Sequence, residues 1–160
     1  MKVKRKSTAF LRLVVYLIGI LVIGLYIFAI PWISSQASTP YRAHVLYPIV
    51  ALLLLTGVPF YLALFNTVKL LNYIDKSKAF SNYSVIALKN IKHCALSISI
   101  LYFLIMPFLY VWADKTDAPG IILMGMVPTF ASIVIATFAS ILQKLLIDAL
   151  EIKNDNDLTI

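Results

Sequence analysis

Four long apolar runs without a charged residue dominate this chain of 160 residues. They extend over residues 13–33, about 47–68, about 94–113 and about 120–143. Each run has about 20 residues or more, enough for a helix that rises 1.5 Å per residue to cross about 30 Å of hydrocarbon. Backbone polar groups inside a bilayer must be satisfied within the spanning element, so the runs are predicted to be helices. The predicted fold is all-α, an integral membrane four-helix bundle in a single domain over residues 1–160.

The composition excludes several classes of protein. Hydrophobic residues make up 61% of the chain and charged residues 13%, and that charged share is about half of what soluble domains carry. The single Cys94 allows no intrachain disulfide, and the two histidines, His44 and His93, lie far apart. No metal site and no cofactor are therefore expected. No acid, base and nucleophile can be assembled into a catalytic group, so the chain is not expected to be an enzyme.

The basic residues predict the orientation in the membrane. One side of the predicted bundle has only Arg42 and Lys115. The other side has Lys2, Lys4, Arg5, Lys6, Arg12, Lys69, Lys76, Lys78, Lys89, Lys92, Lys144 and Lys153. Because lysine and arginine accumulate in cytoplasmic loops, we expect both termini and the connection at residues 69–93 to be cytoplasmic. The predicted location is the bacterial cytoplasmic (inner) membrane, with a multi-pass topology and the lipid bilayer as surroundings.

The first apolar run has a second interpretation as a cleaved signal peptide. "MKVKRK" would be its charged start and "SQA" at residues 35–37 its cleavage site. The run has about 20 residues, whereas the apolar part of a cleaved signal has about 7–15. We expect the segment to be a spanning helix.

The connection at residues 69–93 is predicted to be a cytoplasmic helical hairpin that extends the second and third spans. The second helix continues to Asp75, a turn follows, and a new helix begins after Ser81, whose hydroxyl would accept a hydrogen bond from a free backbone N–H. Phe80 and Val85 have the spacing of a hydrophobic staple around that cap. Asp75 is the only acid in the connection, and we expect it to pair locally with its neighbours Lys76 and Lys78 or to terminate the helix.

The hairpin is also the candidate binding surface. Read conservatively, it is a stiff connection whose lysines only mark the cytoplasmic side; read functionally, it is a basic, partly apolar surface that binds a partner or anionic headgroups. The candidate partner-binding residues are Asp75, Phe80, Ser81, Tyr83, Lys89 and Lys92.

A stripe of small and polar residues marks the fourth run. Its members recur at helical spacing: Thr129, Ser132, Ala136, Ala139 and Gln143. Such stripes let membrane helices approach closely and exchange hydrogen bonds. We interpret this one as the main packing seam of the bundle, with a homo-oligomer face as the alternative. Asn66, near the end of the second run, is expected to form an interhelical hydrogen bond, and the polar tail after residue 150 is expected to fray.

The segment from Leu70 to Phe103 resembles the YoaS-like family, an uncharacterised bacterial family of small four-span membrane proteins. The resemblance rests on an Ile-Asp pair, a Phe-Ser pair and a Leu-Lys-x-Ile motif: Ile74, Asp75, Phe80, Ser81, Leu88, Lys89 and Ile91. Members of that family are often encoded beside a small helix-turn-helix regulator. The resemblance implies a membrane partner that controls a transcription factor, and it implies no catalytic residue.

The predicted function is that of a non-enzymatic signalling or regulatory membrane protein. Its cytoplasmic hairpin would bind a cytosolic partner, and no direct binding of nucleic acid is expected. Two alternatives stay open: a small transport or permeation protein, and an immunity or stress protein of the membrane. A proton-coupled exporter is not expected, because no ionisable residue lies in the middle of a predicted span.

Overall fold

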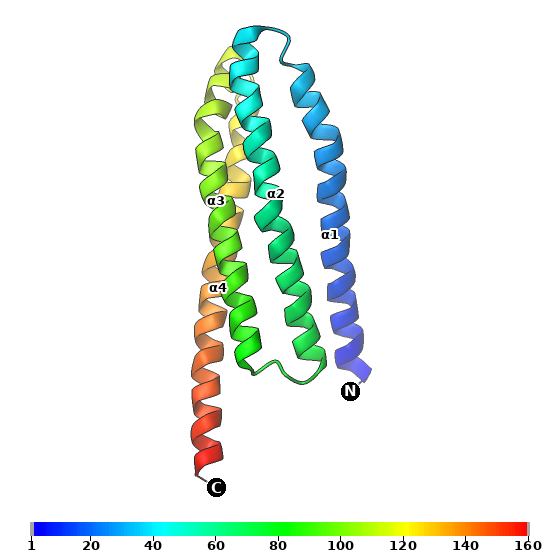
Figure 1. Cartoon of the computed structure of the whole chain (residues 1–160), viewed down its shortest axis with the longest axis vertical. Coiled ribbons are helices and arrows are strands. Elements are labelled where there is room, and N and C mark those ends of the chain that lie inside the picture. Colours follow the sequence, from blue (N-terminus) through cyan, green and yellow to red (C-terminus); the bar gives the residue numbers. More distant parts are fainter. Residues whose placement is uncertain (1, 160) are drawn as a thin grey trace.

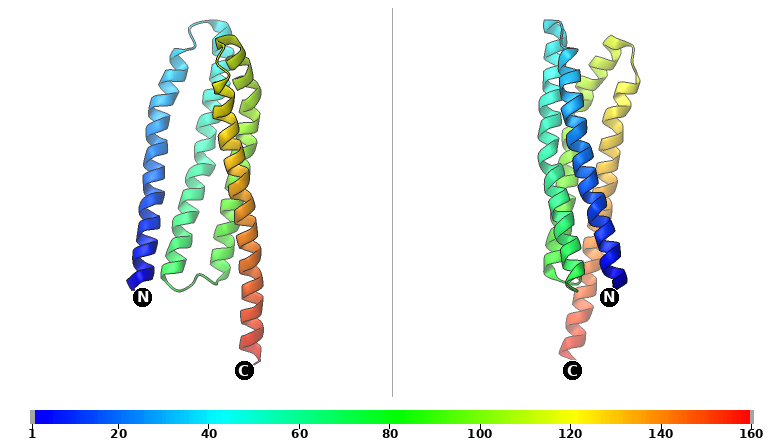
Figure 2. Two further views of the ribbon diagram at one scale, coloured as in Figure 1. Left: turned by 180° about the vertical axis from the view of Figure 1, so that it is seen from behind. Right: turned by 90° about the vertical axis from the view of Figure 1, so that its right-hand side faces the viewer.

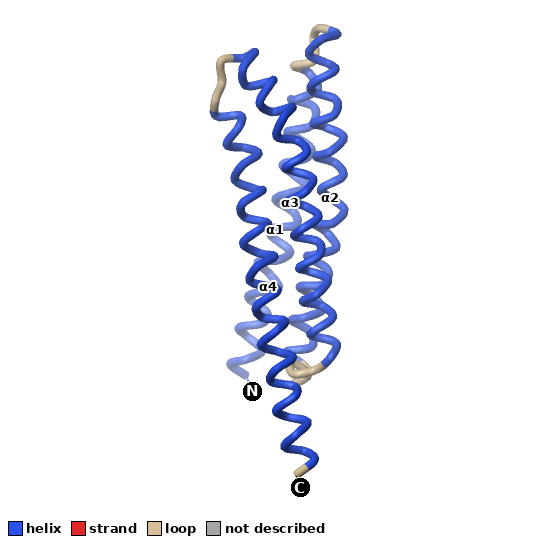
Figure 3. Tube along the Cα trace, turned by 90° about the vertical axis from the view of Figure 1, so that its left-hand side faces the viewer, coloured by secondary structure: helices blue, strands red, loops and turns tan. Residues whose placement is uncertain are grey.

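The chain folds into four long helices, and the described part contains no strand (Figures 1 and 3). The computed structural model describes the backbone of residues 2–159 and the side chains of residues 6–159. The helices are α1 (Lys2–Ser35), α2 (Pro40–Asp75), α3 (Asn82–Thr116) and α4 (Gly120–Leu158). All four are long and apolar enough to cross a membrane. The predicted all-α fold with four membrane helices is confirmed.

The helices pack in chain order. Among the described residues, the backbones of α1 and α2, of α2 and α3, and of α3 and α4 approach closely, and no other pair of helix backbones does. Both termini and the α2–α3 turn lie at one end of the molecule, which we call the terminal end (Figures 1 and 2). The α1–α2 and α3–α4 connections lie at the opposite end.

The buried apolar core lies near the opposite end. Ile33 of α1, Leu46 and Ile49 of α2, and Ile105 and Leu109 of α3 form one cluster. Next to it, the rings of Trp32 and Trp112 lie with their centroids 6.3 Å apart. The end of α1 is therefore held by apolar packing, although most of the helix presents large apolar side chains to its surroundings. In a bilayer these side chains contact acyl chains, so their exposure carries no hydrophobic cost.

Each helix extends beyond the apolar run that predicted it. Residues 13–33, 47–68, 94–113 and 120–143 all fall inside the helices. The helix α2 has 36 residues, about 54 Å at 1.5 Å per residue, whereas the hydrocarbon core is about 30 Å thick. The prolines at 31, 48, 59, 107 and 128 lie within continuous helices.

The C-terminal tail differs from the prediction. It was expected to fray after residue 150, but α4 continues to Leu158 and projects past the other helices at the terminal end (Figure 1). Residues 151–159 are all exposed. No glycine or proline interrupts the chain after Pro128, so nothing local breaks a helix whose preceding turns are already formed.

Candidate functional site

The turn between α2 and α3 is closed by its own backbone. Lys78 N–H donates to the Tyr73 carbonyl at 2.8 Å, and Ser77 N–H donates to the Ile74 carbonyl at 3.1 Å. Ser77 has a left-handed backbone with φ of 57°. This is the Schellman arrangement that ends a helix, with serine at the position that glycine usually takes. The end of α2 at Asp75 is therefore well defined.

Ser81 precedes α3, but its side chain does not cap the helix as predicted. Its hydroxyl donates to the Lys78 carbonyl at 2.7 Å and accepts no hydrogen bond from the first turn of α3. The Ser81 carbonyl instead accepts from Ser84 N–H and Val85 N–H. Ser84 is completely buried, and its hydroxyl lies 3.3 Å from the same Lys78 carbonyl. The two serines thus tie the turn to the start of α3.

Two aromatic side chains stand out at this turn. Phe80 is 61% exposed and Tyr83 is 63% exposed. The Tyr83 ring lies 5.8 Å from the ring of Tyr73 on α2, at an interplanar angle of 34°. Tyr83 is therefore oriented by a neighbour from the facing helix while much of it stays accessible.

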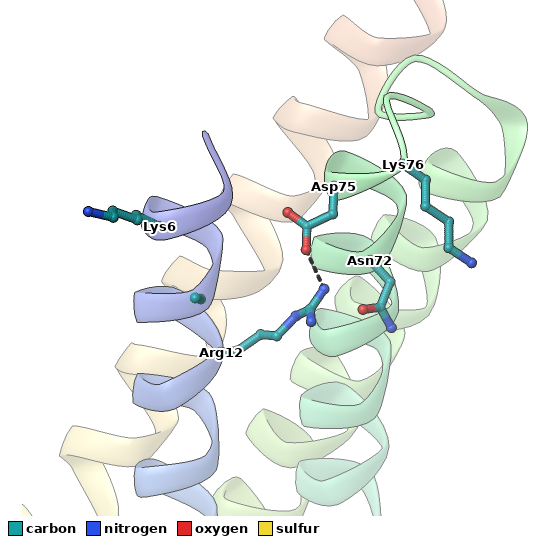
Figure 4. Close-up of a pocket in the computed structure, with 6 residues that line it drawn as sticks. Lys6, Arg12, Asn72, Asp75 and Lys76 are labelled. Carbon is teal, nitrogen blue, oxygen red and sulfur yellow. Dashed lines mark hydrogen bonds and ion pairs between the residues drawn. The ribbon is translucent and has the colours of Figure 1, made fainter. Parts of the chain in front are cut away.

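Asp75 has a partner that the sequence did not indicate. It was expected to pair with Lys76 or Lys78 or to terminate the helix. Asp75 is the last residue of α2, and its carboxylate forms an ion pair with Arg12 of α1 (Figure 4). The two residues are 63 positions apart. Their contact joins the ends of α1 and α2 at the terminal end, which local sequence spacing could not reveal.

The remaining predicted binding residues lie further along α3. Lys89 is exposed and Lys92 is half-buried. Tyr83 and Lys89 lie in α3 and Ser81 directly precedes this helix, whereas Asp75 is the last residue of α2. The turn brings these elements together at the terminal end (Figure 1).

The stripe on α4 faces α3. Ser132, Ala136 and Ala139 are buried, and Thr129 and Gln143 are half-buried. Sequence reasoning missed Gly125, which is also buried. A Cβ atom at Gly125 would lie 2.4 Å from Leu109 Cδ1 and 2.7 Å from Met106 Sδ. Its position four residues before Thr129, in step with the stripe, was the signal that could have identified it.

Interhelical polar contacts hold α1 and α3 to α2. Asn90 Nδ2 of α3 donates to Asn66 Oδ1 at 3.3 Å, so the predicted interhelical hydrogen bond of Asn66 is confirmed. Tyr61 of α2 donates to the Gly19 carbonyl of α1 at 2.9 Å. Tyr26 of α1 lies 3.0 Å from the Thr56 hydroxyl of α2. The two tyrosines were missed, because nothing in their spacing distinguishes them from lipid-facing aromatic residues.

The described residues hold no group of three or more His, Cys, Asp or Glu that could bind a metal ion. His93 is exposed and Cys94 is half-buried. The terminal end presents exposed aromatic and charged side chains.

The comparisons with known proteins agree with this description. Residues 32–160 match the family described as "Protein of unknown function (DUF2975)". The chain is 51% identical to the "Uncharacterized membrane protein YoaS" of Bacillus subtilis (strain 168) over 158 residues, covering 98% of this chain and 99% of that protein. No solved structure matches. The chain therefore belongs to the DUF2975 family of membrane proteins, with YoaS as a near full-length relative.

Proposed function

We propose that the protein is a non-enzymatic regulatory component of the bacterial cytoplasmic membrane. It binds a cytosolic protein through the surface formed by Asp75, Phe80, Ser81, Tyr83, Lys89 and Lys92. The observation that carries the proposal is the exposure of Phe80 and Tyr83 on a turn fixed by its own hydrogen bonds. Exposed aromatic residues on a rigid support are typical anchors of protein interfaces, because little entropy is lost when they are buried.

The distribution of basic residues supports a cytoplasmic location for this surface. At the opposite end the chain has Arg42 and Lys115, and its other basic residues flank the termini and the α2–α3 turn. By the positive-inside rule the terminal end faces the cytoplasm. Both termini are then cytoplasmic as well.

The projecting end of α4 favours a basic partner such as a small helix-turn-helix regulator. Asp148, Glu151, Asp155 and Asp157 are all exposed on this segment. They give the terminal end an acidic surface in addition to the basic one around the turn. A DNA-binding protein is basic, and electrostatic complementarity of this kind would speed its association.

The test is a pull-down of the full-length protein from its native membrane with a matched control. We expect the variant Phe80→Ser/Tyr83→Ser/Lys89→Gln to recover at least about tenfold less of the partner than the unchanged protein, since anchor residues each contribute about 2 kcal/mol or more. The control is Tyr41→Ser/Tyr47→Ser/Arg42→Gln, which removes two exposed tyrosines and one charge at the opposite end. Unchanged recovery with the first variant would remove the proposal.

Two other functions are distinguished by separate measurements. A transport or permeation protein would give flux in reconstituted vesicles that depends on the protein. An immunity or stress protein would change the sensitivity of cells to antimicrobial peptides when deleted, while expression of regulated genes stays the same.

A further inference from the structure

A basic groove lies between α1 and α2 at the terminal end. Its volume is about 640 Å³, and it is lined by Lys6, Ala9, Arg12, Asn72, Asp75 and Lys76. In Figure 4, Arg12 and Asp75 point toward one another across it, while the side chains of Lys6 and Lys76 extend away from this pair, Lys6 on the α1 side and Lys76 on the α2 side. The groove is separate from the exposed aromatic residues of the turn.

The side chains that line the groove carry more positive charge than negative charge. Three cationic side chains and one carboxylate line it, and Asp75 pairs with Arg12. Lys6 and Lys76 have no ion-pair partner among the described residues. The Arg12 Nε–H is buried and also lacks an acceptor in the described part of the chain. Two lysines are therefore available to an anion, and the Arg12 guanidinium keeps one donor that no described residue satisfies.

The depth of the groove matches the phosphate layer of a bilayer. Arg12 is the last charged residue before the apolar part of α1. Lys6 lies six residues earlier, about 9 Å along the helix axis. The headgroup layer on each side of the hydrocarbon is about 5–8 Å thick. A groove that extends from Arg12 to Lys6 therefore spans the level at which lipid phosphates lie.

An apolar stripe continues from the groove along α1. Ala9, Leu13, Tyr16 and Ile20 recur at intervals of four, three and four residues, so they share one face of the helix. All four are exposed, and Ile20 is 71% exposed. Among the described helices the backbone of α1 approaches only that of α2, and the four side chains are exposed, so this face is open to an acyl chain. A soluble inorganic anion has no apolar part that could contact such a stripe.

We propose that the groove binds the headgroup of an anionic phospholipid. Arg12 binds the phosphate, Lys6 and Lys76 on either side of the groove attract it by their charge, and one acyl chain lies along Ala9, Leu13, Tyr16 and Ile20. The lipid phosphate competes with the Asp75 carboxylate for the Arg12 guanidinium. A zwitterionic lipid binds more weakly, because its own ammonium group meets the lysines.

The test counts phosphatidylglycerol and phosphatidylcholine molecules bound to the full-length protein in detergent by native mass spectrometry. The groove variant is Lys6→Gln/Lys76→Gln, and the matched control is Lys144→Gln/Lys153→Gln, which loses the same charge from exposed sites on α4 at the same end. Each juxtamembrane lysine contributes about fivefold to the affinity for anionic lipid. We therefore expect the groove variant to bind phosphatidylglycerol at least about tenfold more weakly than the control does. Equal losses in both variants would overturn the proposal.

Two further experiments test where the acyl chain lies and whether the bound phosphate belongs to a lipid. Phosphatidylglycerol with a photoreactive group in its acyl chain should label the part of α1 from Ala9 to Ile20, and labelling spread evenly over α3 and α4 would overturn the site. Inorganic phosphate alone should bind at least about tenfold more weakly than phosphatidylglycerol, because it lacks the acyl chain. Equal affinity for the two would mean a site for a soluble anion.

Discussion

At the scale of single residues, Gly125 sets how closely α3 and α4 approach. A Cβ atom there would overlap Leu109 and Met106, whereas a Cβ atom at Gly24 of α1 would meet nothing within 4 Å. Gly125 thus has a packing role, and Gly24 has none. The side chains of Ser132, Ala136 and Ala139 continue the contact along α4.

We expect Gly125→Val to destabilise the protein by about 1–3 kcal/mol, the usual cost of overpacking. The control Gly24→Val places the same side chain in a membrane helix where space is open. The measurement is the free energy of unfolding in mixed micelles titrated with a denaturing detergent. Equal effects of the two substitutions would show that helix propensity, and not the α3–α4 contact, decides the outcome.

At the scale of elements, α1 is attached to the rest of the chain mainly through α2, and Trp32 at its end also lies beside Trp112 of α3. Apolar packing around Ile33 holds one end of it, the hydroxyls of Tyr26 and Tyr61 hold its middle, and the Arg12–Asp75 ion pair holds the terminal end. The ion pair is partly exposed, with side-chain exposures of 33% and 21%. Its contribution to stability is therefore modest, and its larger effect is to fix how α1 meets α2.

A double-mutant cycle with Arg12→Gln and Asp75→Asn tests this attachment. Partly exposed ion pairs contribute about 0.5–1 kcal/mol, so the double variant should be that much more stable than the sum of the single losses predicts. Unfolding free energies of the four proteins provide the coupling. Strictly additive losses would mean that the two side chains act independently in the membrane.

Sequence patterns predicted the elements better than the contacts between them. The apolar runs predicted four helices because a bilayer leaves few alternatives for an uncharged segment of that length. The turn near residue 78 was predicted because charge and small polar residues interrupt the apolar pattern there. The Arg12–Asp75 pair could not be predicted, because the two residues are 63 positions apart in the sequence. Their contact depends on how α1 packs against α2. The Ser81 cap was predicted wrongly, because a serine that can accept from a helix can also donate to a preceding carbonyl.

At the scale of the whole molecule, the proposals depend on which side of the membrane the terminal end faces. The natural Cys94 is half-buried, so Cys94→Ala provides a cysteine-free background. Ser77 lies in the α2–α3 turn and Ser38 in the α1–α2 connection, and both are exposed. A cysteine at each of these positions would report on the accessibility of one end of the molecule.

In intact cells, we expect a membrane-impermeant maleimide to label the Cys94→Ala protein with Ser38→Cys and not the one with Ser77→Cys. After permeabilisation both should be labelled, because the probe then reaches the cytoplasmic side. The opposite pattern in intact cells would invert the topology and place the turn and the groove outside.

The ion pair and the turn are covalently adjacent, since Asp75 ends α2 and Lys76 begins the turn that positions Phe80 and Tyr83. A lipid phosphate that draws Arg12 away changes the environment of the residue from which that turn starts. Under the two proposals, lipid binding and partner binding would be thermodynamically linked. Whatever factor an anionic lipid applies to the affinity for the partner, the partner must apply to the affinity for the lipid.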